Sequence, residues 1–354
     1  MQDADVVLEV PAAWFDNPLD CLRHQRLYAS ILVALADLCV TVRPIRLPYA
    51  ADAAPRATKR GQLVISFHSH GAEGNVLRLK DAYWPPYYSA DPMGFSGYAA
   101  AAHQLDRVED AVQTIPRRQA RAFVAELRKD AVERNLSKYA QPAQKAEALP
   151  EDYYFLPLQT VEDPVAELAY LDQLDVAAKL AVGARTRDMS VVLKRHPLCK
   201  SQAVADRLEE LARDLPNVVI STASVHTLIA GARAVVGCNS GVLFEALIHG
   251  KPVVTFGGSD FEIATRSVRR LDDLERAVDD AAQIDPDFRD RFLFWFLKMH
   301  CIHASDVTGI RGRLAEALTA LDIDSHGFNE DQLQVFELYA QAERARREDI
   351  LYPK

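Results

Sequence analysis

Short apolar runs alternate with longer amphipathic segments between residues 153 and 257. The apolar runs have the length and β-branched content of buried strands, and the segments between them repeat apolar positions at helical spacing. Such alternation is typical of a parallel sheet with helices on both faces. The predicted strands are YYFLPL, SVVLKRHP, NVVIS, AVVGC and KPVVTFG, and the predicted helices are AELAYLDQLDVAAKLAV, AVADRLEELARDL, SVHTLIAGA and SGVLFEALIHG.

The first half of the chain shows a weaker version of the same pattern. Strands are predicted at ADVVLEV, VTVRPIRL and QLVISFHSH, with an amphipathic helix from Pro18 to Asp37. Residues 71–97 are polar and aromatic with little periodicity, which favours a loop. A charged helical region is predicted over 107–139, and the segment AQPAQKAEALPED after it has the composition of a linker.

These patterns together predict an α/β protein with two Rossmann-like domains and a helical C-terminal tail. The first domain is expected over residues 1–150, the second over 151–285 and the tail over 286–354, which reads as entirely helical. In parallel sheets of this type, ligands bind at the carboxyl ends of the strands. Polar residues that directly follow a predicted strand are therefore the candidates for a site.

Composition narrows the class of protein. A chain of 354 residues that is 49% hydrophobic can bury more than one core. The formal net charge of −9 argues against a nucleic-acid partner. The N-terminus MQDADVVLEV lacks the basic and apolar regions of a signal peptide, and the apolar runs are too short to span a bilayer. The five cysteines are scattered, which favours reduced thiols and a cytoplasmic location.

The strand SVVL ends in a cluster of potentially cationic side chains: Lys194, Arg195 and His196, followed by Pro197. Each of these residues by itself could simply be an exposed polar residue at the end of a strand. Three such groups together in an acidic protein favour a phosphate-binding role.

A second candidate follows the strand AVVGC, where Asn239, Ser240 and Gly241 open a helix that carries Glu245. Backbone N–H groups at a helix N-terminus, a hydroxyl and a glycine can together bind an anion. Ser240 could equally be a simple N-cap, and Glu245 could bind ribose hydroxyls or face solvent.

A third candidate follows YYFLPL, where Gln159 precedes Glu162 and Asp163. Asp163 before Pro164 has the sequence of an N-cap, so its carboxylate has either a structural or a chemical role. Neighbouring residues on a turn point in different directions, and the sequence does not decide between Glu162 and Asp163.

The loop HSHGAEGN offers His68, His70 and Glu73 after a first-half strand. No clear third ligand follows the two histidines, so no metal site is expected. The aromatic segment YWPPYYSADPMGFSGYA beyond it could stack on sugar rings or pack as a small core of its own.

The motifs PLQTVEDP (157–164), KRHP (194–197) and NSGVLFEALIHGKPVVTFG (239–257) resemble those of bacterial capsule-polysaccharide glycosyltransferases. That family includes the retaining β-Kdo transferases, where Kdo is 3-deoxy-D-manno-octulosonic acid. The resemblance covers roughly residues 153–257. It implies a GT-B fold, whose last helix often crosses back to the N-terminal domain, with the acceptor on the N-terminal domain and the donor CMP-β-Kdo on the C-terminal one.

The resemblance also implies roles for the candidate residues. His196, with Lys194 and Arg195 as supporting charge, would hold the donor phosphate, and Asn239, Ser240 and Gly241 would assist. Glu245 would lie near the ribose, and Gln159 and Asp163 would face the sugar, with Asp163 the nucleophile. Glu73 is the candidate acid or base toward the acceptor. CMP leaves with a single phosphate, so no metal or other cofactor is expected.

The expected partners are a nucleotide sugar and a saccharide or lipid-linked glycan acceptor. With a lipid-linked acceptor, the enzyme would work at the inner face of the cytoplasmic membrane. The alternatives are a transferase using CMP-sialic acid, a UDP-sugar GT-B transferase, and a catalytically inactive nucleotide-sugar-binding subunit.

Overall fold

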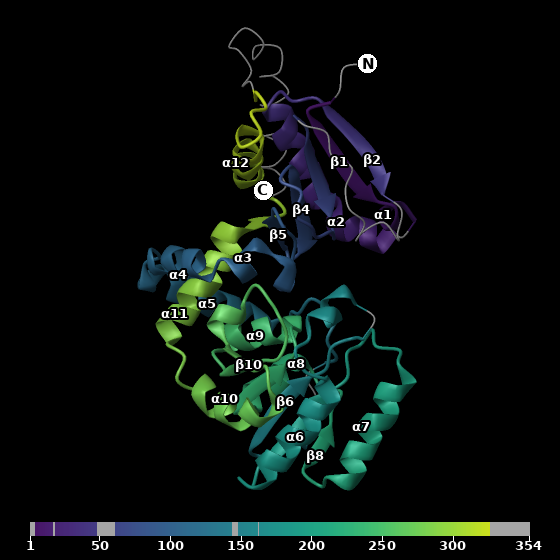
Figure 1. Cartoon of the computed structure of the whole chain (residues 1–354), viewed down its shortest axis with the longest axis vertical. Coiled ribbons are helices and arrows are strands. Elements are labelled where there is room, and N and C mark those ends of the chain that lie inside the picture. Colours follow the sequence, from purple (N-terminus) through teal and green to yellow (C-terminus); the bar gives the residue numbers. More distant parts are fainter. Residues whose placement is uncertain (1–3, 17, 48–60, 144–147, 162, 326–354) are drawn as a thin grey trace, which may run out of the picture. The chain divides into compact units, whose positions relative to one another are not determined.

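The computed structural model describes residues 4–16, 18–47, 61–143, 148–161 and 163–325 (Figure 1). The chain divides into two compact units. One contains Met1–Ala51, Arg56–Ser66 and Ala304–Lys354, and the other contains Asp52–Pro55 and Phe67–His303. The domain boundaries expected near residues 150 and 285 stay predictions.

The first unit is built on three parallel strands. β1 (Val6–Pro11) lies between β2 (Val42–Leu47) and β3 (Leu63–Phe67), so that Val6 pairs with Val42 on one side and Leu63 on the other. The helices of this unit are α1 (Ala13–Asp16), α2 (Pro18–Asp37) and α12 (Val307–Thr319). The helix predicted over residues 18–37 is confirmed as α2. α12 packs on α2, and the nearby Ser30 hydroxyl donates to the carbonyl of Ala304 at 2.8 Å.

The second unit contains a six-stranded parallel sheet with the order β11-β10-β9-β6-β7-β8. From β6 the chain adds β7 and β8 on one side, and it then returns to add β9, β10 and β11 on the other side. The strand order therefore reverses between β6 and β9. This is the strand order of a dinucleotide-binding Rossmann sheet, in which the ligand crevice lies where the order reverses. The strands are β6 (Tyr153–Pro157), β7 (Ser190–Lys194), β8 (Val218–Ile220), β9 (Ala234–Gly237), β10 (Val253–Thr255) and β11 (Arg266–Ser267).

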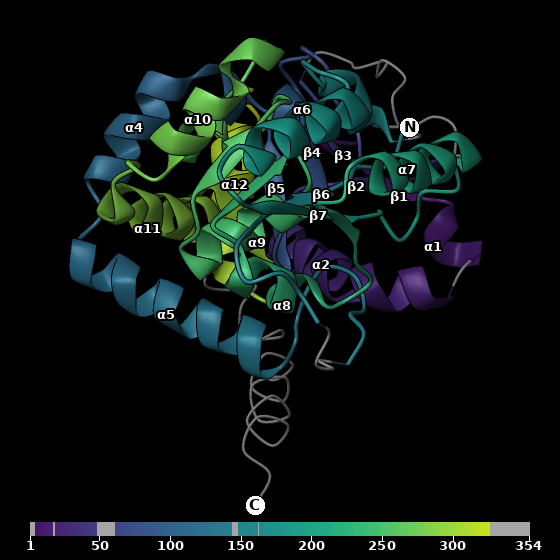
Figure 2. The same cartoon turned by 90° about the horizontal axis from the view of Figure 1, so that it is seen from below.

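Helices cover both faces of this sheet, as the alternation in sequence predicts (Figure 2). Successive side chains of β6 point to opposite faces, with Phe155 in one core cluster and Leu156 in the other. The Leu156 face is covered by α6 (Gln173–Arg185), α7 (Gln202–Asp214) and α10 (Leu274–Ala281), and the Phe155 face by α8 (Val225–Gly231) and α9 (Gly241–His249).

The second unit also has antiparallel strands that the sequence reading missed. β4 (Val76–Asp81) and β5 (Tyr87–Asp91) form a hairpin within the stretch predicted as a loop, and β12 (Cys301–His303) pairs with β5. The prediction of an entirely helical tail is therefore wrong at residues 301–303. These strands are short, and their stability comes from pairing rather than from a periodic pattern.

The predicted helix over residues 107–139 is also wrong in its bounds. The structure has α3 (Ala100–His103), α4 (Leu105–Gln113) and α5 (Arg117–Glu133), with Pro116 preceding α5. Proline lacks a backbone N–H and cannot continue a helix interior, which explains the break. Residues 134–142, which follow α5, form a loop named here the α5–β6 loop.

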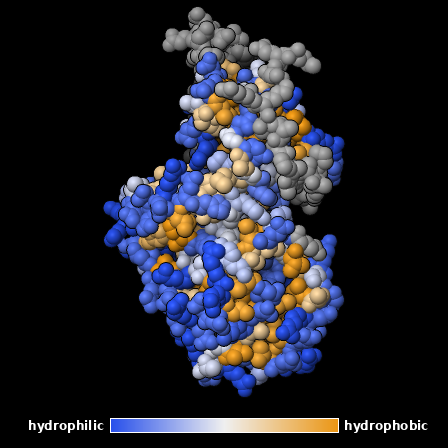
Figure 3. All heavy atoms as spheres, in the orientation of Figure 1, coloured by the Kyte–Doolittle hydropathy of each residue, from blue (hydrophilic) through white to orange (hydrophobic). Residues whose placement is uncertain are grey.

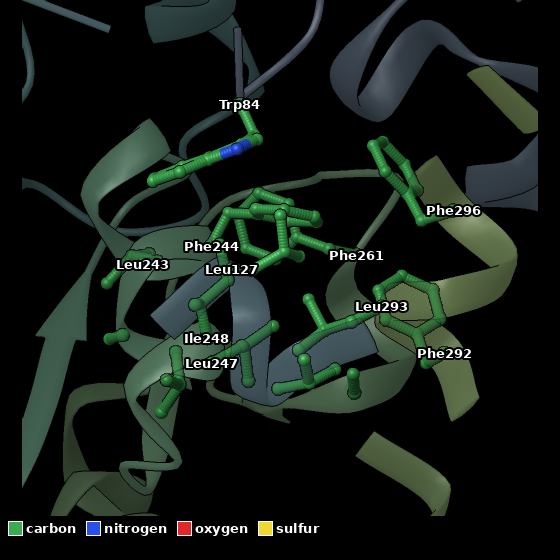
Figure 4. Close-up of a cluster of buried hydrophobic side chains, with 14 of the residues drawn as sticks. Trp84, Leu127, Leu243, Phe244, Leu247, Ile248, Phe261, Phe292, Leu293 and Phe296 are labelled. Carbon is green, nitrogen blue, oxygen red and sulfur yellow. The ribbon is translucent and has the colours of Figure 1, made fainter. Parts of the chain in front are cut away.

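The largest apolar cluster joins the Phe155 face of the sheet to α5 and to α11 (Pro286–Trp295), which continues into a π-helical turn over Phe296–His300. Figure 4 shows Phe244 and Phe261 close together in this cluster, with Trp84, Phe292 and Phe296 around them. Phe244, Phe261 and Phe292 are fully buried. Burial of this many large side chains fixes α9 and the loop after β10 against the sheet.

Substitution of Gly97 by alanine is expected to destabilise the second unit by about 1–3 kcal/mol. A Cβ at position 97 would lie 2.9 Å from the carbonyl carbon and oxygen of Gly258 and 3.0 Å from Leu168 Cδ1. Urea denaturation measures the change. Gly312→Ala on α12 is the matched control, because a Cβ there meets nothing within 4 Å, and alanine favours a helix. Equal stability of Gly97→Ala and wild type would contradict this packing.

Exposed large apolar side chains are dispersed among the described residues. On the face shown in Figure 3 they form small separate groups within a mostly hydrophilic surface. Those of the second unit include Leu105, Val132, Val182 and Leu198, which lie on different elements. No helix of the described residues is both long and apolar enough to cross a membrane.

Candidate active site

Two buried amide side chains meet where the strand order reverses. Gln159 follows β6, and its Nε2 donates to Oδ1 of Asn239, which follows β9, at 3.2 Å. Asn239 Nδ2 donates to the carbonyls of Val165 at 2.8 Å and Gly258 at 3.2 Å. Gln159 and Asn239 therefore hold three loops together at the carboxyl edge of the sheet. Their predicted contacts with the donor would be additional to this structural role.

Asp163 caps the short 3-10 helix η3 (Pro164–Leu168), as the sequence suggested. Its Oδ1 accepts a hydrogen bond from the Val165 N–H at 3.1 Å, and the side chain is half-buried. Oδ2 makes no hydrogen bond to any other residue in the described part of the chain. The cap thus leaves one carboxylate oxygen for chemistry. Glu162, the alternative nucleophile, lies outside the described residues.

Lys194 and Arg195 at the end of β7 bind backbone carbonyls. Lys194 Nζ donates to Thr222 at 3.1 Å and Ala223 at 2.7 Å, and Arg195 Nη2 donates to Ser201 at 2.8 Å. These contacts fix the loops after β7 and β8. Both side chains thereby support the position of His196, and their predicted contact with a phosphate stays a prediction.

His196 is half-buried, and its ring is edge-on to Tyr139 with centroids 5.4 Å apart. Its Nδ1 accepts from the Leu198 N–H at 3.2 Å, so the neutral ring carries its proton on Nε2. Burial lowers the pKa of His196, although the negative charge of Asp163 opposes this. His196 is therefore neutral near pH 7 and can offer Nε2–H as a hydrogen-bond donor to a phosphate.

Helix α9 begins at the predicted anion-binding triplet. Ser240 is its N-cap and accepts from the Val242 N–H at 3.4 Å. A Cβ at Gly241 would meet only Tyr83, at an ordinary 3.6 Å, so packing does not require glycine there. The helix ends at Gly250, whose φ of +81° lies in the left-handed region that favours glycine.

Glu245 is buried on α9 rather than exposed. Its Oε1 accepts from the Ser137 hydroxyl at 2.6 Å, and its Oε2 is buried without a hydrogen bond to a described residue. Burial raises the pKa of Glu245 to about 8, and hydrogen bonds from Ser137 and the Lys138 backbone partly oppose this. The carboxyl group is therefore mostly protonated at neutral pH.

The α5–β6 loop brings in residues that the sequence reading assigned to a helix end and a linker. Ser137 binds Glu245, Tyr139 contacts His196, and Lys138 Nζ forms an ion pair with Asp81 Oδ2 at 2.7 Å. Three consecutive side chains thus reach three separate parts of the second unit. No local sequence signal marks them, because their partners are distant in the chain.

His68 and Glu73, from the loop after β3, have different surroundings. His68 has a left-handed φ of +57°. Burial lowers its pKa to about 4, and Lys80 also lowers it. Glu73 forms an ion pair with the buried Arg78. That pair holds the Glu73 carboxylate, and its predicted role toward the acceptor stays a prediction.

Four ionisable groups share one electrostatic neighbourhood. The charge of Asp163 raises the pKa of both His68 and His196, and the charge of Lys138 lowers the pKa of both. The charges of Asp163 and Lys138 therefore act in opposite directions on the same two imidazoles. Asp163 and His196 come from the sequence prediction, and the structure adds His68 and Lys138 to the groups that influence the site electrostatically.

Most of the aromatic stretch packs as a core. Trp84, Tyr87, Tyr88 and Phe95 are buried, which favours the packing alternative over sugar stacking for these residues. Tyr98 is partly exposed, stacks on His70 at 4.0 Å and donates to the carbonyl of Pro164 at 3.2 Å. Tyr98 therefore positions the turn that carries Asp163.

Comparison with known proteins adds to this geometry. Residues 95–270 match the family model described as capsule polysaccharide biosynthesis protein. This match spans all three motifs noted in the sequence and confirms the predicted resemblance. No curated protein sequence matches the chain.

Two solved structures share the fold. The β-Kdo 2,7-transferase of Thermosulfurimonas dismutans KpsC has 16% identity and a TM-score of 0.51, over 90% of this chain and 99% of that one. The β-Kdo 2,4-transferase of the same protein has 16% identity and a TM-score of 0.50, over 90% and 98%. The similarity confirms the predicted α/β, GT-B fold class.

Proposed function

Since this chain belongs to the capsule polysaccharide biosynthesis family, we propose that it is a retaining glycosyltransferase that moves β-Kdo from CMP-β-Kdo to a saccharide acceptor. The observation that carries the proposal is that Asp163 and His196 follow neighbouring parallel strands, β6 and β7, so that a carboxylate and a hydrogen-bond donor belong to the same edge of the sheet. The negative charge of Asp163 also raises the pKa of His196, against the effect of burial.

In this proposal the donor phosphate accepts a hydrogen bond from His196 Nε2–H and lies near the N-terminus of α9. Both interactions grow stronger as negative charge develops on the departing CMP. Glu245, within α9, is the candidate partner for ribose hydroxyls. A single phosphate can be stabilised in this way by the chain's own groups, and we expect no metal requirement.

Asp163 then has the role of nucleophile. Its free Oδ2 attacks C2 of the sugar while the C2–oxygen bond to CMP breaks, which forms a glycosyl ester and releases CMP. An acceptor hydroxyl next attacks C2, displaces the Asp163 carboxylate and gives its proton to a general base, for which Glu73 is the candidate. Two inversions at one carbon give net retention, as in retaining glycosidases.

The test is a transfer assay with CMP-Kdo generated in situ and a panel of saccharide and lipid-linked acceptors. We expect CMP release and a β-linked Kdo product, and greater thermal stabilisation by CMP than by UDP. Transfer from CMP-sialic acid alone, or stronger stabilisation by UDP, would favour a different donor. CMP binding without turnover on any acceptor would favour an inactive nucleotide-sugar-binding subunit.

A further inference from the structure

Two lysines share one carboxylate at the end of β4. Asp81 Oδ1 lies 3.1 Å from Lys80 Nζ, and Asp81 Oδ2 lies 2.7 Å from Lys138 Nζ. One carboxylate neutralises only one of two ammonium groups, so this group of three side chains carries a surplus positive charge. Lys138 retains donor capacity, because an ammonium group has three N–H bonds and both of its hydrogen-bonding contacts go to Asp81.

The backbone around Lys138 is anchored on both sides. Before it, the Leu136 carbonyl lies 2.6 Å from His226 Nε2, and the Ser137 hydroxyl binds Glu245. After it, the Tyr139 ring lies against His196. A lysine held in this way is a preorganised cation, which loses less freedom on binding an anion than an exposed lysine loses.

Lys138 borders the groups that would meet the sugar donor, because the ring of the next residue, Tyr139, lies 5.4 Å from that of His196. Lys138 acts on His68 and His196, and Asp163 acts on the same two imidazoles. Both imidazoles are neutral near pH 7 because burial lowers their pKa values. Among these four groups Lys138 is therefore the one cation.

We propose that Lys138, held by Asp81, binds the carboxylate of an acidic sugar donor and so selects ulosonic acids over neutral sugars. This inference rests on the proposed function. In an ulosonic acid the carboxylate is attached to the anomeric carbon, the atom that Asp163 would attack. Two carboxylates would repel one another at that distance, and a fixed ammonium group offsets the repulsion.

Binding is the first test. Calorimetry with CMP-saturated protein compares the methyl β-glycoside of Kdo with its C1 methyl ester, which lacks the negative charge. We expect wild type to bind the acid about ten to a hundred times more tightly than the ester, the range expected for a charge-assisted hydrogen bond. Lys138→Met should bind the two about equally, and Lys138→Arg should keep part of the preference.

Lys129→Met is the matched control, because Lys129 is an exposed lysine on α5. It loses the same charge and should keep the full preference for the acid. Lys138→Met should fold, since Asp81 retains Lys80 as a partner. Equal binding of the acid and the ester by wild type would overturn the proposal. So would a full preference for the acid in Lys138→Met, or a wild type that binds neither compound.

Kinetics separate this inference from the proposed function. With CMP-Kdo as donor, Lys138→Met should raise KM about tenfold or more while CMP affinity stays unchanged. Normal transfer by Lys138→Met would overturn the role of Lys138 and leave the proposed function intact. The opposite result is also possible: wild type transfers no sugar from any CMP-ulosonic acid, but its binding of the acid still depends on Lys138. That result would overturn the proposed function and support the carboxylate subsite.

Discussion

Replacing Asp163 with asparagine is expected to lower the rate of sugar transfer about a thousandfold or more, the scale seen when a nucleophile is removed. An amide oxygen cannot form the glycosyl ester that double displacement requires. CMP affinity should stay within a few-fold of wild type, because the nucleotide contacts are assigned to His196, the α9 N-terminus and Glu245. A transfer assay measures the first effect, and CMP titration by calorimetry measures the second.

This substitution separates the chemical role of Asp163 from its structural one. Asp163 Oδ1 accepts from the Val165 N–H as the cap of η3. Asparagine is about as good an N-cap as aspartate, so the turn and the overall stability should be preserved. A loss of activity in a folded variant would then reflect the carboxylate itself.

Asp172→Asn is the matched control. Asp172 caps α6 by accepting from the N–H groups of Leu174 and Asp175, at 2.8 and 3.0 Å, and it is exposed. The same isosteric change there should leave transfer unaltered. Asp163→Asn with transfer within tenfold of wild type would exclude Asp163 as nucleophile and direct attention to Glu162.

The second half of the chain could be predicted from sequence because its elements are locally encoded. The strand of β7 stops where Lys194 begins a polar run, and the helix of α9 starts at a serine cap and ends at Gly250. Parallel strands bring such ends to one edge of the sheet, so Gln159, His196 and Ser240 could be grouped without coordinates.

The role of the α5–β6 loop could not be predicted in the same way. Ser137, Lys138 and Tyr139 follow a charged helix and lack any motif, and their partners Glu245, Asp81 and His196 are 108, 57 and 57 residues away in sequence. The carbonyl contacts of Lys194 and Arg195 could not be predicted either. The two residues form a cluster that is visible in the sequence, but the carbonyls they bind belong to residues 222, 223 and 201, which no sequence pattern assigns to them.

Glu245→Gln is expected to change how the stability of the protein depends on pH. Burial raises the pKa of Glu245 to about 8 in the folded protein, whereas an unfolded chain has a value near 4.5. The folded state therefore binds a proton that the unfolded state releases as the pH rises above about 4.5. Through this one group, wild type should lose about 3 kcal/mol of stability between pH 5 and pH 8.

Glutamine mimics the protonated acid. Its oxygen can accept from the Ser137 hydroxyl as Oε1 does, and its amide group takes the place of the buried Oε2. The variant has no proton to lose at this position, so its free energy of unfolding should fall less steeply than that of wild type between pH 5 and pH 8. Urea denaturation at pH 5, 6, 7 and 8 measures the free energy of unfolding of both proteins, and their difference should grow steadily in favour of glutamine.

Other buried groups titrate in the same range but are common to both proteins. Burial raises the pKa of Asp260 to about 7 and lowers that of His249 to about 4, while His226 is lowered as well. Asp260→Asn is the matched control. It should remove the fall in the free energy of unfolding that Asp260 causes between about pH 4 and pH 7, and it should keep the fall that Glu245 causes up to pH 8. Parallel stability curves for wild type and Glu245→Gln would mean that Glu245 is already ionised in the folded protein. The α5–β6 loop would then be held at Ser137 by a charged hydrogen bond rather than a neutral one.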